Sequence, residues 1–332
     1  MIQHRIFSVY EPSQIGEVRR AVNEMAFSMG SFEELAGRAA IVATELASNL
    51  VKHANNGGEI LIRQLGHYKS SGLEIISVDR GPGIENPSYM ILDGVSTAGT
   101  GGNGLGAVRR LSQVFDLYTM LQKGTIVLAQ LFERPWNEEK SYFQVGSIMR
   151  AKPGEYACGD GWSFLHQKEG LKIILSDGLG HGTEAAIASQ EALRLFHSVE
   201  ASPREYIQKM NTALRHTRGA AVAITSIDLI RQKIAYAAVG NISGRIISSE
   251  DVIGCLSYNG IVGMNGNRFQ EIDYAWPCKG YLILHSDGIS SRWDINQYPG
   301  IITHHPTLLA ALLYRDHARE TDDATVVVVQ QR

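Results

Sequence analysis

The spacing of apolar residues predicts alternating strands and helices in the first part of the chain. A strand is expected over residues 5–9, and a first helix from Pro12 onward, where apolar side chains recur every three or four positions. A second helix begins with a Ser31–Glu34 capping box and runs to about His53. Strands over residues 59–65, 73–78 and 125–132, and a helix over residues 107–115, are expected to follow.

The pattern of the second half predicts a domain rich in strands. Strands are expected over residues 143–149, 161–166, 171–175, 221–229, 233–238, 244–247, 268–272, 281–285 and 324–330, and helices over residues 183–199, 203–215 and 307–318. Many strands with few helices favour two packed sheets with helices outside, an α+β sandwich. A proline within a charged cluster predicts a linker over residues 134–140, between domains of residues 1–133 and 141–332.

Composition narrows the class of protein. The 332 residues are 44% hydrophobic and 20% charged, typical of a globular protein of two domains. A net charge of −3 gives no reason to expect nucleic acid or an acidic membrane surface. Three cysteines without a CxxC pair, and the lack of a signal peptide or a long apolar run, predict a cytoplasmic protein with reduced thiols.

Aspartates follow several of the expected buried strands. Asp177 stands in Leu-Ser-Asp-Gly-Leu-Gly-His-Gly, and Asp287 ends Tyr-Leu-Ile-Leu-His-Ser-Asp-Gly. Asp160 ends Ala-Cys-Gly-Asp, and the pair Asp322-Asp323 precedes the last strand. Hard divalent cations prefer carboxylate and carbonyl oxygens, so strand ends that meet in one core would form a metal site. Separate loop aspartates are the simpler alternative.

These motifs resemble those of the metal-dependent PPM-type serine/threonine phosphatases, closest to the bacterial SpoIIE-type branch. The resemblance implies an αββα sandwich in which two Mn²⁺ or Mg²⁺ ions activate a water. It implies metal ligands at Asp160, Asp177, the Gly178 carbonyl, Asp287 and Asp322. A glycine at position 178 has no Cβ to hinder its carbonyl. Asp323 could exchange roles with Asp322.

Three further features of this domain bear on the resemblance. The resemblance implies that Asp177 bridges the two metal ions. Eukaryotic relatives have a histidine two positions after this aspartate, where this chain has Leu179, so His181 is only a candidate general acid. Gly240-Asn-Ile-Ser resembles a turn of the family and predicts a structural role. The His304-His305 pair has no cysteine or carboxylate at zinc-site spacing and predicts a loop.

A second set of motifs lies in the first domain. Glu45, Asn49 and His53 share one helix face at i, i+4 and i+8, which is usually a solvated face. Asp79-Arg-Gly-Pro-Gly83 follows an expected strand, and a Gly-rich stretch over residues 94–106 precedes a helix, where backbone amides bind phosphates. The stretch contains G-x-G-x-x-G, but no strand directly precedes it, which excludes the dinucleotide fold.

Together these motifs resemble the N, G1 and G2 boxes of the GHKL ATP-binding fold, within it the RsbT-like serine-protein kinases of the anti-sigma-factor group. The resemblance implies ATP and Mg²⁺, with Asn49 on the metal, Asp79 on the adenine amino group and Glu45 as the catalytic base. It implies nucleotide contacts at Asn49, Asp79, Gly81, Gly83, Gly99, Gly101, Gly102, Gly104, Leu105, Gly106 and Thr125. Many relatives have an apolar residue where this chain has Asn103. His53 is expected to be a packed helix residue and not a catalytic one.

The two resemblances imply a bifunctional switch enzyme. It would phosphorylate a serine of a STAS-domain antagonist protein, remove that phosphate with its second domain, and interact with other partner-switching proteins. The intact Glu45 and Asn49 favour this reading over an N-terminal domain that only docks a partner and regulates the phosphatase. A catalytically inactive phosphatase scaffold is the third alternative. The oligomeric state, the upstream signal and the metal used in the cell stay open.

Overall fold

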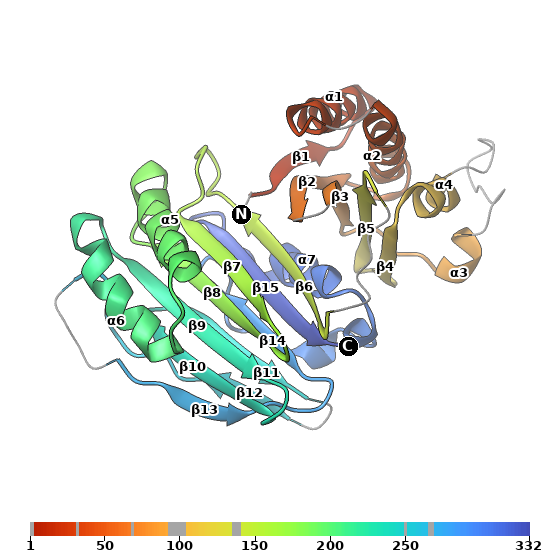
Figure 1. Cartoon of the computed structure of the whole chain (residues 1–332). Coiled ribbons are helices and arrows are strands. Elements are labelled where there is room, and N and C mark those ends of the chain that lie inside the picture. The colour runs from red at the N-terminus through yellow and green to blue at the C-terminus, as the bar shows by residue number, and fades with distance from the viewer. Residues whose placement is uncertain are drawn as a thin grey trace. The chain divides into compact units, whose positions relative to one another are not determined.

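The computed structural model describes residues 3–30, 33–67, 70–91, 104–134, 141–248, 251–264 and 269–332. The chain separates into two compact units, one of Ile2–Glu139 with Gly300–Leu308 and the other of Lys140–Pro299 with Leu309–Arg332. Figure 1 shows their elements. Both units combine helices with sheets, which confirms the predicted α+β class. No helix in these described ranges is long and apolar enough to cross a membrane.

The first unit is one antiparallel sheet with helices packed against it (Figure 1). Its elements are β1 (Arg5–Val9), α1 (Pro12–Ser28), α2 (Glu33–His53), β2 (Gly58–His67), β3 (Ser70–Asp79), α3 (Pro87–Met90), α4 (Gly104–Leu111), β4 (Val114–Met120) and β5 (Gly124–Phe132). The strand order is β1-β2-β3-β5-β4. A capping box between Glu11 and Gln14, with Pro12 in the first turn, begins α1. One apolar cluster joins α1, α2 and α4 to the sheet.

The predicted helix over residues 107–115 is wrong at both ends. Helix α4 begins at Gly104 and ends at Leu111, and Val114–Met120 form strand β4, which the sequence did not predict. Leu111 and Phe115 have helical spacing, but the backbone N–H of Gln113 already donates to Gln130 O at 3.0 Å. Pairing with β5 therefore overrides the local helical pattern. Ser31 of the expected capping box lies outside the described residues.

The second unit is a sandwich of two sheets. Its elements are β6 (Phe143–Arg150), β7 (Asp160–Gln167), β8 (Gly170–Gly178), α5 (Thr183–Ser198), α6 (Pro203–Ala213), η1 (Leu214–His216), β9 (Ala220–Asp228), β10 (Lys233–Val239), β11 (Ser243–Ile247), β12 (Val252–Cys255), β13 (Ile272–Ala275), β14 (Tyr281–His285), η2 (Ile295–Gln297), most of α7 (Pro306–His317) and β15 (Ala324–Gln331), while η3 (Ile301–Thr303) belongs to the first unit. In the described residues the sheets run β13-β10-β9-β8-β7 and β12-β11-β14-β15-β6. One apolar cluster fills the space between the sheets, and another packs α5 and α6 on the first sheet.

Two strands of this sandwich differ from the sequence prediction. The strand expected over residues 268–272 is wrong, because β13 begins only at Ile272. Strand β12 was missed, since it is a short edge strand whose side chains are mostly exposed and therefore show no buried face. The long strands β8 and β15 were found because they are buried almost throughout and form continuous apolar runs.

The short segment Gly300–Leu308 groups with the first unit. Within that unit Asp116 of β4 accepts a hydrogen bond from the His305 backbone N–H at 2.6 Å and lies 2.9 Å from His304 Nδ1. The two histidines stand between η3 and α7, outside helix and strand, as the sequence predicted. The predicted linker lies almost entirely outside the described residues, so the domain boundaries stay a prediction.

Candidate functional sites

The aspartates of the second unit come from the ends of strands in both sheets. Asp160 begins β7 and faces Asp177, near the end of β8, as its partner in the antiparallel register. Asp287 follows β14, and Asp322-Asp323 precede β15. The sequence predicted this arrangement from strands that stop at carboxylates. The structure thus brings carboxylates distant in sequence to one edge of the sandwich.

Burial and mutual repulsion raise the pKa values of these carboxyls. Burial first, then the charges of Asp160, Asp287, Asp322 and Asp323, raise the pKa of Asp177 to about 9. Burial raises the pKa of Asp160 to about 7, against the lowering effect of the hydrogen bond from Ser286. The pKa of Asp287 is also raised, by burial and by Asp322. The cluster is therefore short of positive charge.

The Asp160 carboxylate fits a cation. Its Oδ2 accepts a hydrogen bond from Ser286 Oγ at 2.7 Å, while its buried Oδ1 has no hydrogen-bond partner. A buried oxygen of this kind needs a partner, and a divalent cation supplies one. Within the ranges that the structure describes, no three His, Cys, Asp or Glu side chains are yet grouped closely enough to hold a metal ion.

The two adjacent aspartates before β15 have different environments. Asp323 is buried, and its oxygens accept the backbone N–H groups of Lys152 at 2.8 Å and Gly159 at 2.9 Å. Asp322 is only half-buried, and one of its oxygens accepts the N–H of Asp323. Asp323 therefore anchors a loop. This difference favours Asp322 as the ligand of the pair.

Gly178 is required for packing. A Cβ at this position would lie 2.1 Å from the Ala185 carbonyl oxygen in α5. The sequence predicted that glycine is needed at position 178 so that its own carbonyl can approach a metal ion. The structure gives a separate reason, since the first turns of α5 pack directly on the end of β8.

Asn241 is a polar neighbour of the site, in a turn for which the sequence predicted a structural role. Its side-chain amide donates to Asp287 Oδ2 at 2.6 Å and so orients a candidate ligand. The sequence signal was the position of Asn241 after strand β10, but nothing local connects it to Asp287. Ser286, which holds Asp160, was likewise missed, although it directly precedes Asp287.

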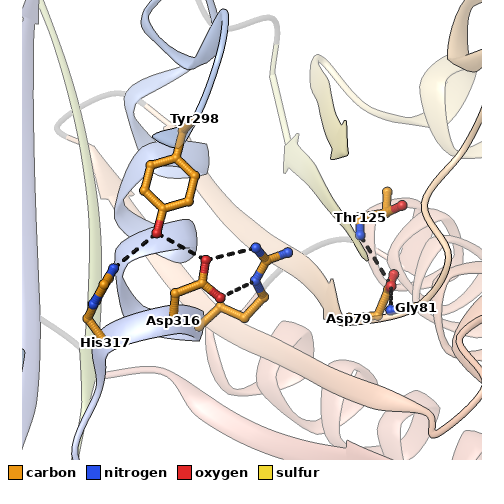
Figure 2. Close-up of polar contacts among 7 residues, drawn as sticks. Asp79, Gly81, Thr125, Tyr298, Asp316 and His317 are labelled. Atoms are coloured by element: carbon orange, nitrogen blue, oxygen red, sulfur yellow. Dashed lines mark hydrogen bonds and ion pairs between the residues drawn. The ribbon is translucent and has the colours of Figure 1, made fainter. Parts of the chain in front are cut away.

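The turn that holds Asp287 is fixed by the end of α7. Ser290 N–H donates to His317 O at 2.9 Å, and Arg319 N–H donates to Gly288 O at 2.8 Å. The His317 ring lies 3.0 Å from the Tyr298 hydroxyl, which also donates to Asp316 Oδ2 at 3.1 Å (Figure 2). This network limits the movement of the Asp287 turn.

The candidate nucleotide site of the first unit centres on Asp79, the last residue of β3. Its Oδ1 accepts backbone N–H groups from Gly81 at 2.7 Å and Thr125 at 3.2 Å (Figure 2). Thr125 is buried, and its hydroxyl lies 2.9 Å from the Thr119 hydroxyl. Gly83 has φ +76°, and a Cβ there would lie 2.3 Å from Met120 O. The structure thus brings the predicted Asp79, Gly81 and Thr125 together.

The remaining predicted nucleotide residues are on helices or outside the described ranges. Glu45 and Asn49 are half-buried residues of α2. Gly104, Leu105 and Gly106 form the first turn of α4 rather than the loop before it. Gly99, Gly101, Gly102 and Asn103 lie outside the described residues. The described part of α4 begins at Gly104, and backbone N–H groups in the first turn of a helix can bind anions.

Two known families match different parts of the chain. Residues 167–332 match the family described as Stage II sporulation protein E (SpoIIE), which is half of the 332-residue chain. The chain belongs to the SpoIIE family. Residues 9–131 of this SpoIIE-family protein match the Histidine kinase-like ATPase domain. Both resemblances stated from the sequence motifs are therefore confirmed.

Two proteins of Bacillus subtilis (strain 168) are similar to different parts of this SpoIIE-family chain. Over 111 residues the chain is 35% identical to Serine/threonine-protein kinase RsbT, a match that covers 33% of this chain and 80% of RsbT. Over 155 residues it is 24% identical to Phosphoserine phosphatase RsbX, covering 46% of this chain and 78% of RsbX. The first unit is therefore RsbT-like, and the second is a PPM-type phosphatase domain.

Solved structures support the fold of the phosphatase domain. A chain from work on the bacterial stressosome, described as a modular system adapted to control secondary messenger signaling, has a TM-score of 0.53 at 29% identity, covering 56% of this chain and 98% of that one. RsbX in complex with magnesium has a TM-score of 0.53 at 22% identity, and the match covers 59% of this chain and 98% of the RsbX chain. The relatives imply ATP, divalent metals and protein interactions of the partner-switching kind.

Proposed function

We propose that this protein is a bifunctional switch enzyme. Its first unit transfers phosphate from ATP to a serine of a STAS-domain antagonist protein, and its second unit hydrolyses the phosphoserine of such a protein. The observation that supports this most directly is that one chain covers 80% of a kinase, RsbT, and 78% of a phosphoserine phosphatase, RsbX. Two opposed activities in one chain would set the phosphorylation level of the partner by their ratio.

In the phosphatase unit we assign the metal ligands to Asp160, Asp177, the Gly178 carbonyl, Asp287 and Asp322. Two Mn²⁺ or Mg²⁺ ions, when bound, supply an acidified water as nucleophile and charge neutralisation for the phosphate. The chain's own residues set up this site. The buried Oδ1 of Asp160, which has no hydrogen-bond partner, would bind a cation. Ser286 fixes the orientation of Asp160, and Asn241 fixes that of Asp287.

In the kinase-like unit we assign the adenine contact to Asp79, with Gly81, Gly83 and Thr125 shaping the base site. The Asp79 carboxylate is held by two backbone N–H groups, so it is already oriented to accept a hydrogen bond from an exocyclic amine. The Thr119–Thr125 hydroxyl pair lies next to this carboxylate. Main-chain amides at the start of α4 would bind the phosphates.

We assign phosphoryl-transfer roles to two residues of α2. Asn49 would bind Mg²⁺ through its amide oxygen, and Glu45, one turn earlier, would accept the proton of the substrate serine. Both side chains are half-buried, so each can reach a ligand without leaving the helix surface. The contacts to Gly99, Gly101 and Gly102 are retained as proposals for the preceding loop.

The test is a phosphate-transfer assay with a candidate STAS-domain protein, ATP, Mg²⁺ and Mn²⁺, read by mass spectrometry. We expect Asp177→Asn to accumulate phosphoserine on the partner, and Glu45→Gln to abolish transfer while keeping affinity for ATP. The wild-type protein should remove phosphate from a pre-phosphorylated partner.

Two other outcomes would change the assignment. Dephosphorylation by wild type without transfer by Asp177→Asn would leave a phosphatase whose ATP-binding unit only docks or regulates. Absence of both reactions with an intact fold would reject the enzyme proposal. The partner's identity is tested by replacing the candidate serine with alanine, which should remove every mass shift.

A further inference from the structure

We infer that His181 is the proton donor to the departing serine oxygen in the phosphatase unit and that Glu155 is the residue that positions it. The inference rests on the proposed phosphatase activity. His181 Nδ1 lies 2.7 Å from Glu155 Oε1. The two side chains remain 45% and 34% exposed, so a protein substrate can reach them. With Nδ1–H donating to Glu155, Nε2 is left for the substrate.

The histidine belongs to the same turn as the metal-site residues at the end of β8. His181 stands three residues after Gly178, and the turn is fixed by two backbone bonds, Gly178 N–H to Gly159 O at 3.1 Å and Leu179 N–H to Gly219 O at 3.0 Å. Gly180 and Gly182 on either side of His181 have φ +88° and +75°. Glycine therefore permits the sharp path that presents the imidazole.

The glutamate comes from a loop that is anchored by Asp323, the residue after the candidate ligand Asp322. Both ends of the segment from Lys152 to Gly159 donate backbone N–H groups to the carboxylate of Asp323, at 2.8 and 2.9 Å. A further bond from Glu155 N–H to Lys152 O, at 2.9 Å, tightens the loop just before the glutamate side chain. One buried carboxylate thus holds the loop that holds His181.

Glycine at position 182 is needed for this contact. A Cβ on Gly182 would lie 2.9 Å from Glu155 Oε2, so a larger residue would push the carboxylate away from the imidazole. Arg218 lies at the same turn, since its Nη1 would be 3.3 Å from a Cβ on Gly180, the residue before His181. A guanidinium at this turn suits a doubly charged phosphate.

In the proposed step the water oxygen forms a bond to phosphorus while the bond between phosphorus and the serine Oγ breaks. The electron pair of that bond goes to the serine Oγ, which takes the proton from His181 Nε2. The attacking water releases a proton to solvent, and the imidazole regains one from solvent. The products are serine and inorganic phosphate, without an oxidant or any other reactant.

Leaving groups of different basicity separate this role from a structural one. A serine alkoxide needs a proton to depart, whereas p-nitrophenolate leaves readily without one. We expect His181→Gln to lower kcat on a phosphoserine peptide by about 10²–10⁴-fold, the usual contribution of a general acid, and kcat on p-nitrophenyl phosphate by less than about 10-fold. Glu155→Gln should give the same selective loss with a smaller magnitude, because the imidazole remains but is no longer oriented.

Two controls complete the experiment on the full chain with saturating Mn²⁺. His166→Gln, at the exposed far end of β7, should leave both substrates unaffected. Added imidazole should restore part of the phosphoserine activity of His181→Ala. An equal loss on both substrates, or no loss on the peptide, would overturn the assignment of His181. If wild type hydrolyses neither substrate, the proposed phosphatase function fails instead, so the two failures are distinguishable.

Discussion

Metal binding to the phosphatase unit should displace protons in an amount that the site's burial determines. With the pKa of Asp177 raised to about 9 and that of Asp160 raised to about 7, we expect the pair in the metal-free protein to hold about 1.5 protons together at pH 7. A coordinating carboxylate must lose its proton. We therefore expect the release of about 1.5 protons at pH 7 and about 0.5 at pH 9.

The same two carboxyls determine how the stability of the metal-free protein depends on pH. Between their ordinary pKa near 3.8 and the raised folded values, the folded metal-free protein binds protons that the unfolded chain has lost. The free energy of unfolding without metal should therefore fall as pH rises through this window, up to about 9. Saturating metal should remove most of that fall, because the cation replaces the protons.

The assay is titration calorimetry of the full chain with Mg²⁺, repeated in buffers of different ionisation enthalpy at pH 7 and pH 9. The variant Ser286→Ala should raise the pKa of Asp160 further, since it removes the hydrogen bond that lowers this pKa. Its proton release at pH 7 should rise from about 1.5 towards about 2. Asp228→Asn, a half-buried change at the opposite end of the sheet from Asp177, should match wild type. Release near zero at pH 7, or equal release at both pH values, would refute the reasoning.

Three further substitutions test the two units. Glu74→Gln should destabilise the first unit by about 3–5 kcal/mol in urea unfolding, because it removes the negative charge of a buried ion pair with Arg63. The ion pair lowers the pKa of Glu74 to about 2 despite burial, so its stabilisation should persist above pH 4.5 and be lost as pH falls towards 2. Gly83→Ala should cost at least about 1 kcal/mol and weaken ATP binding, measured by fluorescence, because its φ is positive. Asn241→Ala should weaken metal affinity in calorimetry by about 10–100-fold, since it frees a candidate ligand.

Each of these has a matched control and an opposing result. Glu17→Gln, on the exposed side of α1, should leave stability unchanged, and equal stability of Glu74→Gln would contradict the buried pair. Gly66→Ala, where a Cβ meets nothing within 4 Å, should bind ATP normally. Wild-type metal affinity in Asn241→Ala would show that its amide does not orient the site.

The positions at which strands end in carboxylates were readable from the sequence because apolar runs stop there abruptly. Strands β8 and β14 are buried along nearly their whole length, and each is followed or ended by an aspartate and a glycine. The same local logic located Asp79 at the end of β3. Composition and these motifs were enough for the fold class and both families.

Local pattern was insufficient wherever pairing decided the structure. Strand β4 was hidden because its first residues continue a helical spacing, and only hydrogen bonds to β5 make it a strand. Strand β12 has no buried face to mark it. Both are edge strands of their sheets. An edge strand pairs with one neighbour and is only partly buried, so its sequence lacks a clear alternation of apolar and polar residues.

By itself the sequence determined which residue types stand at the ends of buried strands, since burial requires apolar runs and turns require glycine and polar residues. Only the tertiary structure decided what those residues do to each other. It showed that Asp323 anchors a loop, that Asn241 holds Asp287, and that Glu155 holds His181. The partners in these pairs are 171, 46 and 26 residues apart, so no local pattern records contacts that depend on how the two sheets pack.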